Sequence, residues 1–89
     1  MNSNRDFFLY AFPTSFSKEL NIRILGTNRA MPFSIFTSSG ECLYHDFVSE
    51  ITTIDTLLFP PGIYFLRYRQ EGKNRFIKLY KPLETTQIS

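Results

Sequence analysis

The stretch that decides the fold class is Lys18-Glu19-Leu20-Asn21-Ile22-Arg23-Ile24, in which apolar and polar side chains alternate one by one. Successive side chains of a β-strand point to opposite faces, so this alternation gives one apolar face and one polar face. An α-helix, with about 3.6 residues per turn, would spread the three aliphatic side chains around its circumference. The stretch therefore predicts a strand of a sheet that is buried on one side only.

The same period of two recurs along the chain, and turn residues or prolines separate the segments that show it. Residues 63–69 give the strongest further prediction, because the side chains of Tyr64, Leu66 and Tyr68 share one face. The predicted strands are 7–12, 18–24, 33–37, 42–45, 51–55, 63–69 and 76–81. About seven short strands with turn signals between them indicate an all-β domain, built as a two-sheet antiparallel sandwich. An OB-like barrel is the alternative, but several strands have a polar face, which favours the sandwich.

Length and composition set the domain organisation. A chain of 89 residues forms one domain, and 43% hydrophobic with 20% charged residues is typical of a globular chain. The sandwich is predicted at residues 7–82, because Pro82 stops the last strand. Residues 1–6 are predicted to be a disordered tail and residues 83–89 a flexible one.

No targeting or membrane segment is predicted. No apolar run approaches the roughly 18 residues that span a bilayer, so no membrane insertion is expected. The apolar residues 7–12 are too few for the core of a signal peptide. The protein is therefore expected in the cytoplasm if it is translated as this chain alone. If the chain is part of a larger exported protein, it is expected to be secreted or displayed on the cell surface.

The residue types that catalysis or metal binding would need are scarce. The chain has one cysteine, Cys42, and one histidine, His45. Their odd separation on a strand predicts that they lie on opposite faces, so they would not form a catalytic dyad. A zinc site needs about four ligands, and the glycines are spread one per turn instead of forming a phosphate-binding loop. The sequence therefore predicts a protein that is not an enzyme and binds no metal or cofactor, with Cys42 as a small buried apolar residue.

The segment Phe59-Pro60-Pro61-Gly62-Ile63-Tyr64-Phe65-Leu66 leads into the strongest strand. Gly62 allows a sharp turn at the start of the strand. Tyr64 is placed to bury its ring and to return its hydroxyl to backbone upstream, which resembles the tyrosine corner of Greek-key sandwiches. We expect this corner to shape the fold and to bind nothing by itself.

Positive charge gathers in the last hairpin. Between residues 67 and 81 a single acidic residue, Glu71, opposes six basic ones: Arg67, Arg69, Lys73, Arg75, Lys78 and Lys81. Such charges can simply protect an edge strand from pairing with other chains. They can equally form a surface that recognises an acidic partner, a membrane face or a nucleic acid, with Phe65 and Phe76 as stacking platforms.

An ordered set of motifs runs through nearly the whole chain, from about Phe8 to Lys81. It comprises Phe12-Pro13, residues 16–22, residues 33–36 with a turn at Gly40, Thr53-Ile54-Asp55, residues 59–65, and Lys78-Leu79-Tyr80-Lys81. This order resembles the C-terminal sorting domain of the type IX secretion system of Bacteroidetes. The sequence departs from that family's pattern in three places: Thr14-Ser15 follows Pro13 where the family has Asn-Pro, Thr56 stands where the family has a leucine, and residues 82–89 extend beyond the basic closing strand.

The resemblance implies an immunoglobulin-like Greek-key sandwich of seven strands. It also implies a non-catalytic address that the outer-membrane secretion machinery recognises for export and surface attachment, here without a signal peptide or cargo. On that resemblance the candidate recognition residues are Gly62, Ile63, Tyr64, Arg67, Arg69, Lys78, Leu79 and Lys81.

Two other functions stay open at the level of sequence. The first is a free-standing adhesive or scaffolding sandwich that binds a protein or glycan, with self-association through edge strands as one form of it. The second is an OB-like nucleic-acid binder that uses Phe65, Arg67, Arg69, Arg75 and Phe76. A nucleic-acid partner is not expected, because the net charge is only +2 and OB-like barrels do not require the residue 60–64 corner.

Overall fold

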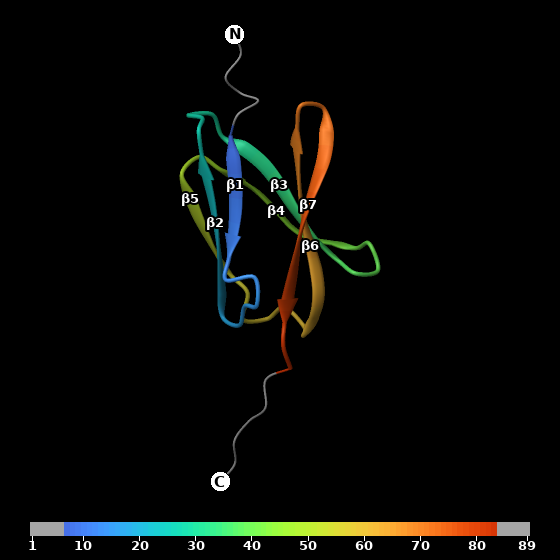
Figure 1. The fold of residues 1–89 in the computed structure, drawn as a ribbon. Coiled ribbons are helices and arrows are strands. Elements are labelled where there is room, and N and C mark those ends of the chain that lie inside the picture. The colour runs from blue at the N-terminus through green and yellow to red at the C-terminus, as the bar shows by residue number, and fades with distance from the viewer. Residues whose placement is uncertain (1–6, 84–89) are drawn as a thin grey trace.

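The computed structural model describes residues 7–83, which form two antiparallel sheets packed face to face (Figure 1). The smaller sheet has the order β1 (Phe8–Phe12), β2 (Glu19–Leu25), β5 (Ile51–Asp55). The larger sheet has the order β4 (Cys42–Val48), β3 (Met31–Thr37), β6 (Gly62–Gln70), β7 (Lys73–Lys81). The predicted seven-stranded, two-sheet sandwich is confirmed, and the strands do not close into one barrel. The Greek-key assignment in its finer detail stays a prediction.

The strand boundaries differ most from the predicted ones in β4, which continues to Val48 instead of ending at residue 45, and in the last hairpin. The strands β6 and β7 are joined by only Glu71 and Gly72, and both have positive φ angles, 56° and 75°. A two-residue turn with two positive φ angles matches the twist of the strands it connects. Pairing therefore continues to the tip, and β7 begins at Lys73 rather than at residue 76. The predicted tails, residues 1–6 and 83–89, lie outside the described residues except for Leu83.

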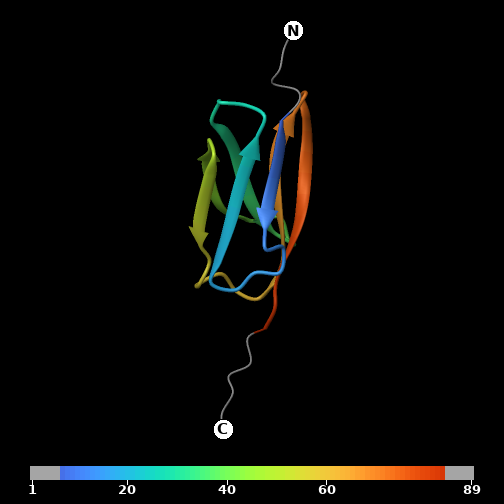
Figure 2. The ribbon, with the colours of Figure 1, turned by 60° about the vertical axis from the view of Figure 1, so that its left-hand side comes forward.

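The core lies between the two sheets, and Figure 2 shows them as two layers. The alternation quoted at the start is confirmed, because Leu20, Ile22 and Ile24 of β2 are all buried. Across the core they face buried side chains of the larger sheet, among them Ile35 and Leu66. Each such side chain contributes roughly 1.5–3 kcal/mol when it leaves water, so the alternating pattern is the main source of stability.

The chain between β1 and β2 joins the two sheets along one side of the sandwich. Ser15 forms a parallel bridge to Tyr80 of β7. The Tyr80 N–H donates to Thr14 O at 2.8 Å, and the Phe16 N–H donates to Tyr80 O at 2.9 Å. At the other end of this side, Gln70 Nε2 donates to Phe7 O at 2.9 Å. The chain on either side of β1 is thus tied to the larger sheet, to β7 after the strand and to the end of β6 before it.

Two predictions about Cys42 are wrong, for one physical reason. The pairing of β3 with β4 shifts by one residue, so that Ile35 pairs with Tyr44 while Phe36 pairs with Cys42. A β-bulge of this kind changes which face the following side chains occupy. Cys42 is therefore exposed instead of buried, and it lies on the same outer face as His45, which pairs with Ser34. Its thiol contacts Tyr44 O at 3.6 Å.

Candidate recognition face

Two of the predicted recognition residues, Tyr64 and Lys81, turn inwards at the end of the sandwich where β6 begins. Only 2% of Tyr64 and 7% of Lys81 are exposed. Lys81 Nζ donates to three backbone carbonyls: Thr56 O at 2.7 Å, Leu57 O at 3.0 Å and Phe59 O at 2.8 Å. An ammonium group has three protons to donate, so this set uses all of them. The ammonium group of Lys81 is therefore bound within the protein and does not meet a partner.

The tyrosine corner predicted from the sequence is present beside this lysine. The Tyr64 hydroxyl donates to Pro60 O. Burial raises the pKa of Tyr64, because the charged phenolate would lose water there. We call Lys81, Tyr64 and the connection at residues 56–60 the corner latch. Through this latch, Tyr64 of β6 and Lys81 of β7 hold the connection between β5 and β6 in place.

Thr56, which replaces a leucine in the family's pattern, belongs to the same end of the fold. It is fully buried, and its Oγ1 donates to Ser17 O at 3.0 Å. Its N–H donates to Lys18 O, also at 3.0 Å. A leucine could make the backbone bond but not the side-chain bond. The threonine therefore ties the latch to the start of β2, and this departure from the family's pattern has a structural role here.

Aromatic rings fill the space under the latch. The rings of Phe16, Phe59 and Tyr64 lie with centroid separations of 5.5 to 6.2 Å, two of the pairs tilted and one edge to face. Pairs with this geometry add about 0.5–1.5 kcal/mol each beyond the apolar area they bury. The early Phe16 and the late corner are therefore parts of one packed unit.

The outward face of β3, β6 and β7 carries the remaining basic residues among aromatic ones. Residues that pair across strands share a face, so register alone places these side chains together. We define the basic–aromatic face as Phe36, Phe65, Arg67, Arg69, Phe76 and Lys78. The three strands contain no aspartate or glutamate, so no carboxylate on them neutralises this face.

The two arginines of this face are held in place. The Arg67 guanidinium lies 4.7 Å from the centre of the Phe36 ring, a cation–π contact. Arg69 donates to Asn74 Oδ1 at 3.2 Å and to Gly72 O at 2.7 Å. Neither arrangement neutralises the charge. The face therefore presents fixed positive groups to the solvent.

The structure divides the eight predicted recognition residues into two groups. Three are buried: Tyr64, Leu79 and Lys81. Five are at least partly exposed: Gly62, Ile63, Arg67, Arg69 and Lys78. Gly62 has a φ of 148°, in the region that favours glycine, so its role is conformational. Arg67, Arg69 and Lys78 are the members of the predicted set that can meet a partner by charge.

Sequence reasoning missed Phe36 as a member of this face. It lies on β3, far from the basic hairpin along the chain, and only the pairing of β3 with β6 brings it beside Arg67. The alternation of residues 33–36 could have shown this, because Phe33 and Ile35 point into the core and Phe36 therefore points to the outward face.

The edge strand β4 carries a small polar pair. The Tyr44 hydroxyl donates to Asp46 Oδ2 at 2.9 Å, and the Phe47 N–H donates to Asp46 Oδ1 at 2.7 Å. The backbone bond, followed by the tyrosine bond, lowers the pKa of Asp46. Burial, with the nearby carboxylate, raises the pKa of Tyr44.

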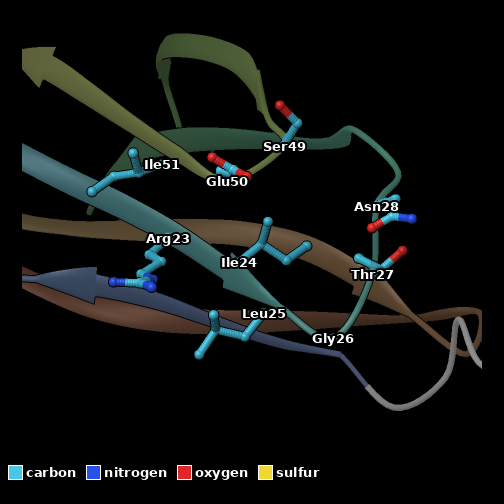
Figure 3. A pocket seen from close by; sticks show the side chains of 9 residues that line it. All are labelled: Arg23, Ile24, Leu25, Gly26, Thr27, Asn28, Ser49, Glu50 and Ile51. Carbon is cyan, nitrogen blue, oxygen red and sulfur yellow. The ribbon is translucent and has the colours of Figure 1, made fainter.

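A recess lies at the opposite end of the sandwich from the latch, where β2 ends and β4 turns into β5 (Figure 3). It is lined by Arg23, Ile24, Leu25, Gly26, Thr27, Asn28, Ser49, Glu50 and Ile51. One arginine and one glutamate leave its lining without net charge. It has no basic excess like that of the basic–aromatic face, and none of the predicted recognition residues lines it.

Comparison with known proteins adds no relative. No protein-family model matches the chain, and no curated protein matches it either. Residues 7–83 hold no group of three or more histidine, cysteine, aspartate or glutamate side chains that could bind a metal ion. Within the same residues, no helix has the length and apolar character to cross a membrane.

Proposed function

We propose that the protein is a non-catalytic sorting module, recognised by outer-membrane machinery of the type IX secretion kind for export and surface attachment. One observation carries the proposal: the two late motifs of the resemblance meet in space. Lys81, which ends the basic closing motif, donates to three carbonyls of the connection that begins the corner motif. A shared structural role gives a physical reason for the two motifs to occur together.

On this proposal the two groups of motif residues act differently. The corner latch gives the module its shape, and the basic–aromatic face is what a receptor contacts. Arg67, Arg69 and Lys78 then steer an acidic receptor surface towards the module, since β3, β6 and β7 contain no aspartate or glutamate that would repel it.

The test fuses the full chain behind a signal peptide and a reporter, in a Bacteroidetes strain that has the secretion machinery. In the strain with the machinery we expect the reporter on the cell surface. In a strain without the translocon we expect it to stay in the periplasm. The double variant R67E/K78E should lower surface display at least tenfold. K18E/R23E, a matched double charge reversal at exposed residues before and within β2 of the smaller sheet, should leave display unchanged. Retention of all reporter in the periplasm by the unmodified chain would overturn the proposal.

A second candidate is an adhesive or scaffolding module, and a separate observation favours it. The outward face of β1 exposes three aromatic residues in a row, Phe8, Tyr10 and Phe12, and the sorting proposal does not use them. Leu25 and Ile51 on the same face are also exposed. Contiguous exposed apolar side chains mark sites that bind proteins or ligands. Light scattering of the protein in solution and binding to an array of glycans test this candidate. A strictly monomeric protein that binds no glycan would count against it.

A further inference from the structure

The free edge of β7 has a defined set of unpaired backbone groups. Strand β7 is the last strand of its sheet, and the only strand it pairs with among residues 7–83 is β6; on its other side the single bridge of Tyr80 to Ser15 lies beyond residues 73–78. The N–H and C=O of Tyr80 point away from β6, because they bond to Thr14 and Phe16. Backbone groups alternate in direction along a strand, so Asn74, Phe76 and Lys78 point the same way. Within residues 7–83, the outward N–H and C=O groups of these three residues form no backbone hydrogen bond.

The tight hairpin gives the same assignment independently. In a two-residue hairpin the closing residues, here Gln70 and Lys73, form a hydrogen-bonded pair. Odd-numbered residues of β7 therefore bond to β6, and even-numbered ones face outwards. Three outward residues offer three donors and three acceptors over residues 73–78, a length of about 20 Å.

The charges around this edge are positive on both sides of the sheet. Lys78 lies on the outward face with Arg67 and Arg69, while Lys73 and Arg75 are exposed near the hairpin tip. Strand β7 contains no acidic residue. Basic edge strands reject strands that carry positive charge, including a second copy of β7. The same charges attract an extended segment that carries carboxylates.

We propose that β7 receives an extended acidic peptide segment as an added strand along residues 73–78. Main-chain bonds to Asn74, Phe76 and Lys78 supply affinity, and the flanking lysines and arginines select acidic side chains. Phe76, which is 59% exposed at the middle of the edge, packs against apolar side chains on one face of the segment, while Lys73 and Arg75 meet acidic side chains on its other face. The inference does not depend on the sorting role, because a recognition domain of any kind can receive a strand in this way.

The test titrates the full chain with a fluorescent ten-residue peptide of alternating glutamate and valine, followed by anisotropy. Two control peptides have lysine in place of glutamate, or the same acidic sequence with alternate backbone nitrogens methylated. We expect the acidic peptide to bind and to slow hydrogen exchange at the amides of Asn74, Phe76 and Lys78. The lysine peptide should not bind, and methylation should weaken binding at least tenfold.

A pair of variants isolates the backbone contribution within the protein. F76A and F76P both remove the ring, but only F76P also removes an outward N–H. Proline is accepted at such an edge position because its missing N–H faces solvent. We expect F76A to weaken binding severalfold and F76P to abolish it, with the fold of each verified by circular dichroism.

Three results would overturn the proposal. The first is equal binding of the methylated and unmethylated acidic peptides, which would indicate charge attraction without strand addition. The second is no binding of the acidic peptide at low salt. The third is tight binding of a single-stranded oligonucleotide that the acidic peptide cannot displace, which would assign the basic surface to nucleic acid.

Discussion

Two lysines of the closing strand, three residues apart, have opposite environments. Lys78 is exposed on the basic–aromatic face, whereas Lys81 is buried and donates to three carbonyls of the corner latch. Their odd separation places them on opposite faces of β7. A basic motif on a strand can therefore contain one charge for a partner and one charge for the fold. The experiments below separate the two, beginning with the largest expected effect.

Replacing Lys81 with alanine tests the buried member of the pair. Three charge-assisted bonds are lost, and three carbonyls at a buried corner lose their donor. We expect the free energy of unfolding to fall by about 3–5 kcal/mol. Urea denaturation measures this, with K78A as the matched control, expected within about 0.5 kcal/mol of the unmodified chain. Equal losses in the two variants would contradict the contrast between them.

Replacing Tyr64 with phenylalanine removes the other bond of the latch but keeps the ring. We expect the free energy of unfolding to fall by about 1–2 kcal/mol, since the Pro60 carbonyl is left without its donor.

The raised pKa of Tyr64 also predicts that the stability of the protein depends on pH. The contribution of Tyr64 is fully present below the pKa of an unfolded tyrosine, about 10, and is lost as pH rises through the higher folded value. Urea denaturation between pH 8 and 11 should show a steeper alkaline loss in the unmodified chain than in Y64F. An equal alkaline loss of stability in Y64F and the unmodified chain would contradict this role of Tyr64.

Replacing Thr56 with valine keeps the shape and removes one bond, from Oγ1 to Ser17 O. We expect a loss of about 1 kcal/mol, with T56S keeping the bond but losing a methyl group. Thermal unfolding followed by circular dichroism measures both. If T56V were as stable as the unmodified chain, the hydroxyl of Thr56 would have no structural role.

The smallest effect is expected at Asp46, on the opposite edge of the same sheet. Its folded pKa is lowered, so its stabilising contribution is present above the pKa of an unfolded aspartate and is lost as pH falls through the folded value. D46N should therefore flatten the dependence of stability on pH in the acid range. Urea denaturation between pH 2.5 and 6 compares D46N with the unmodified chain. If the free energy of unfolding of D46N depended on acid pH as it does in the unmodified chain, Asp46 would make no pH-dependent contribution to stability.

The properties that depend on neighbours in sequence were predictable. Alternation gave the strands and their buried faces, and Gly62 followed by Tyr64 was enough to predict the buried ring with its hydroxyl returned to backbone. Both are local consequences of strand geometry.

The properties that depend on distant segments were not predictable. Lys78 and Lys81 look alike in a list of basic residues, and only the passage of residues 56–60 over the end of β7 distinguishes them. The bulge that turns Cys42 outwards likewise arises from the pairing of β3 with β4, which no residue near Cys42 announces.

The bridge from Tyr80 to Thr14 and Phe16 also sets an order of events during synthesis. Ribosomes extend a chain at about 5–20 residues per second, so Phe16 leaves the ribosome several seconds before its partner. Contacts between segments so far apart are slow to form and are made late. Until residues 80 and 81 emerge, residues 14–16 and the residue 56–60 connection both lack the hydrogen bonds that β7 supplies. The closing strand is thus the step that completes the domain, and a chain truncated within β7 is expected to expose its core to chaperones and proteases.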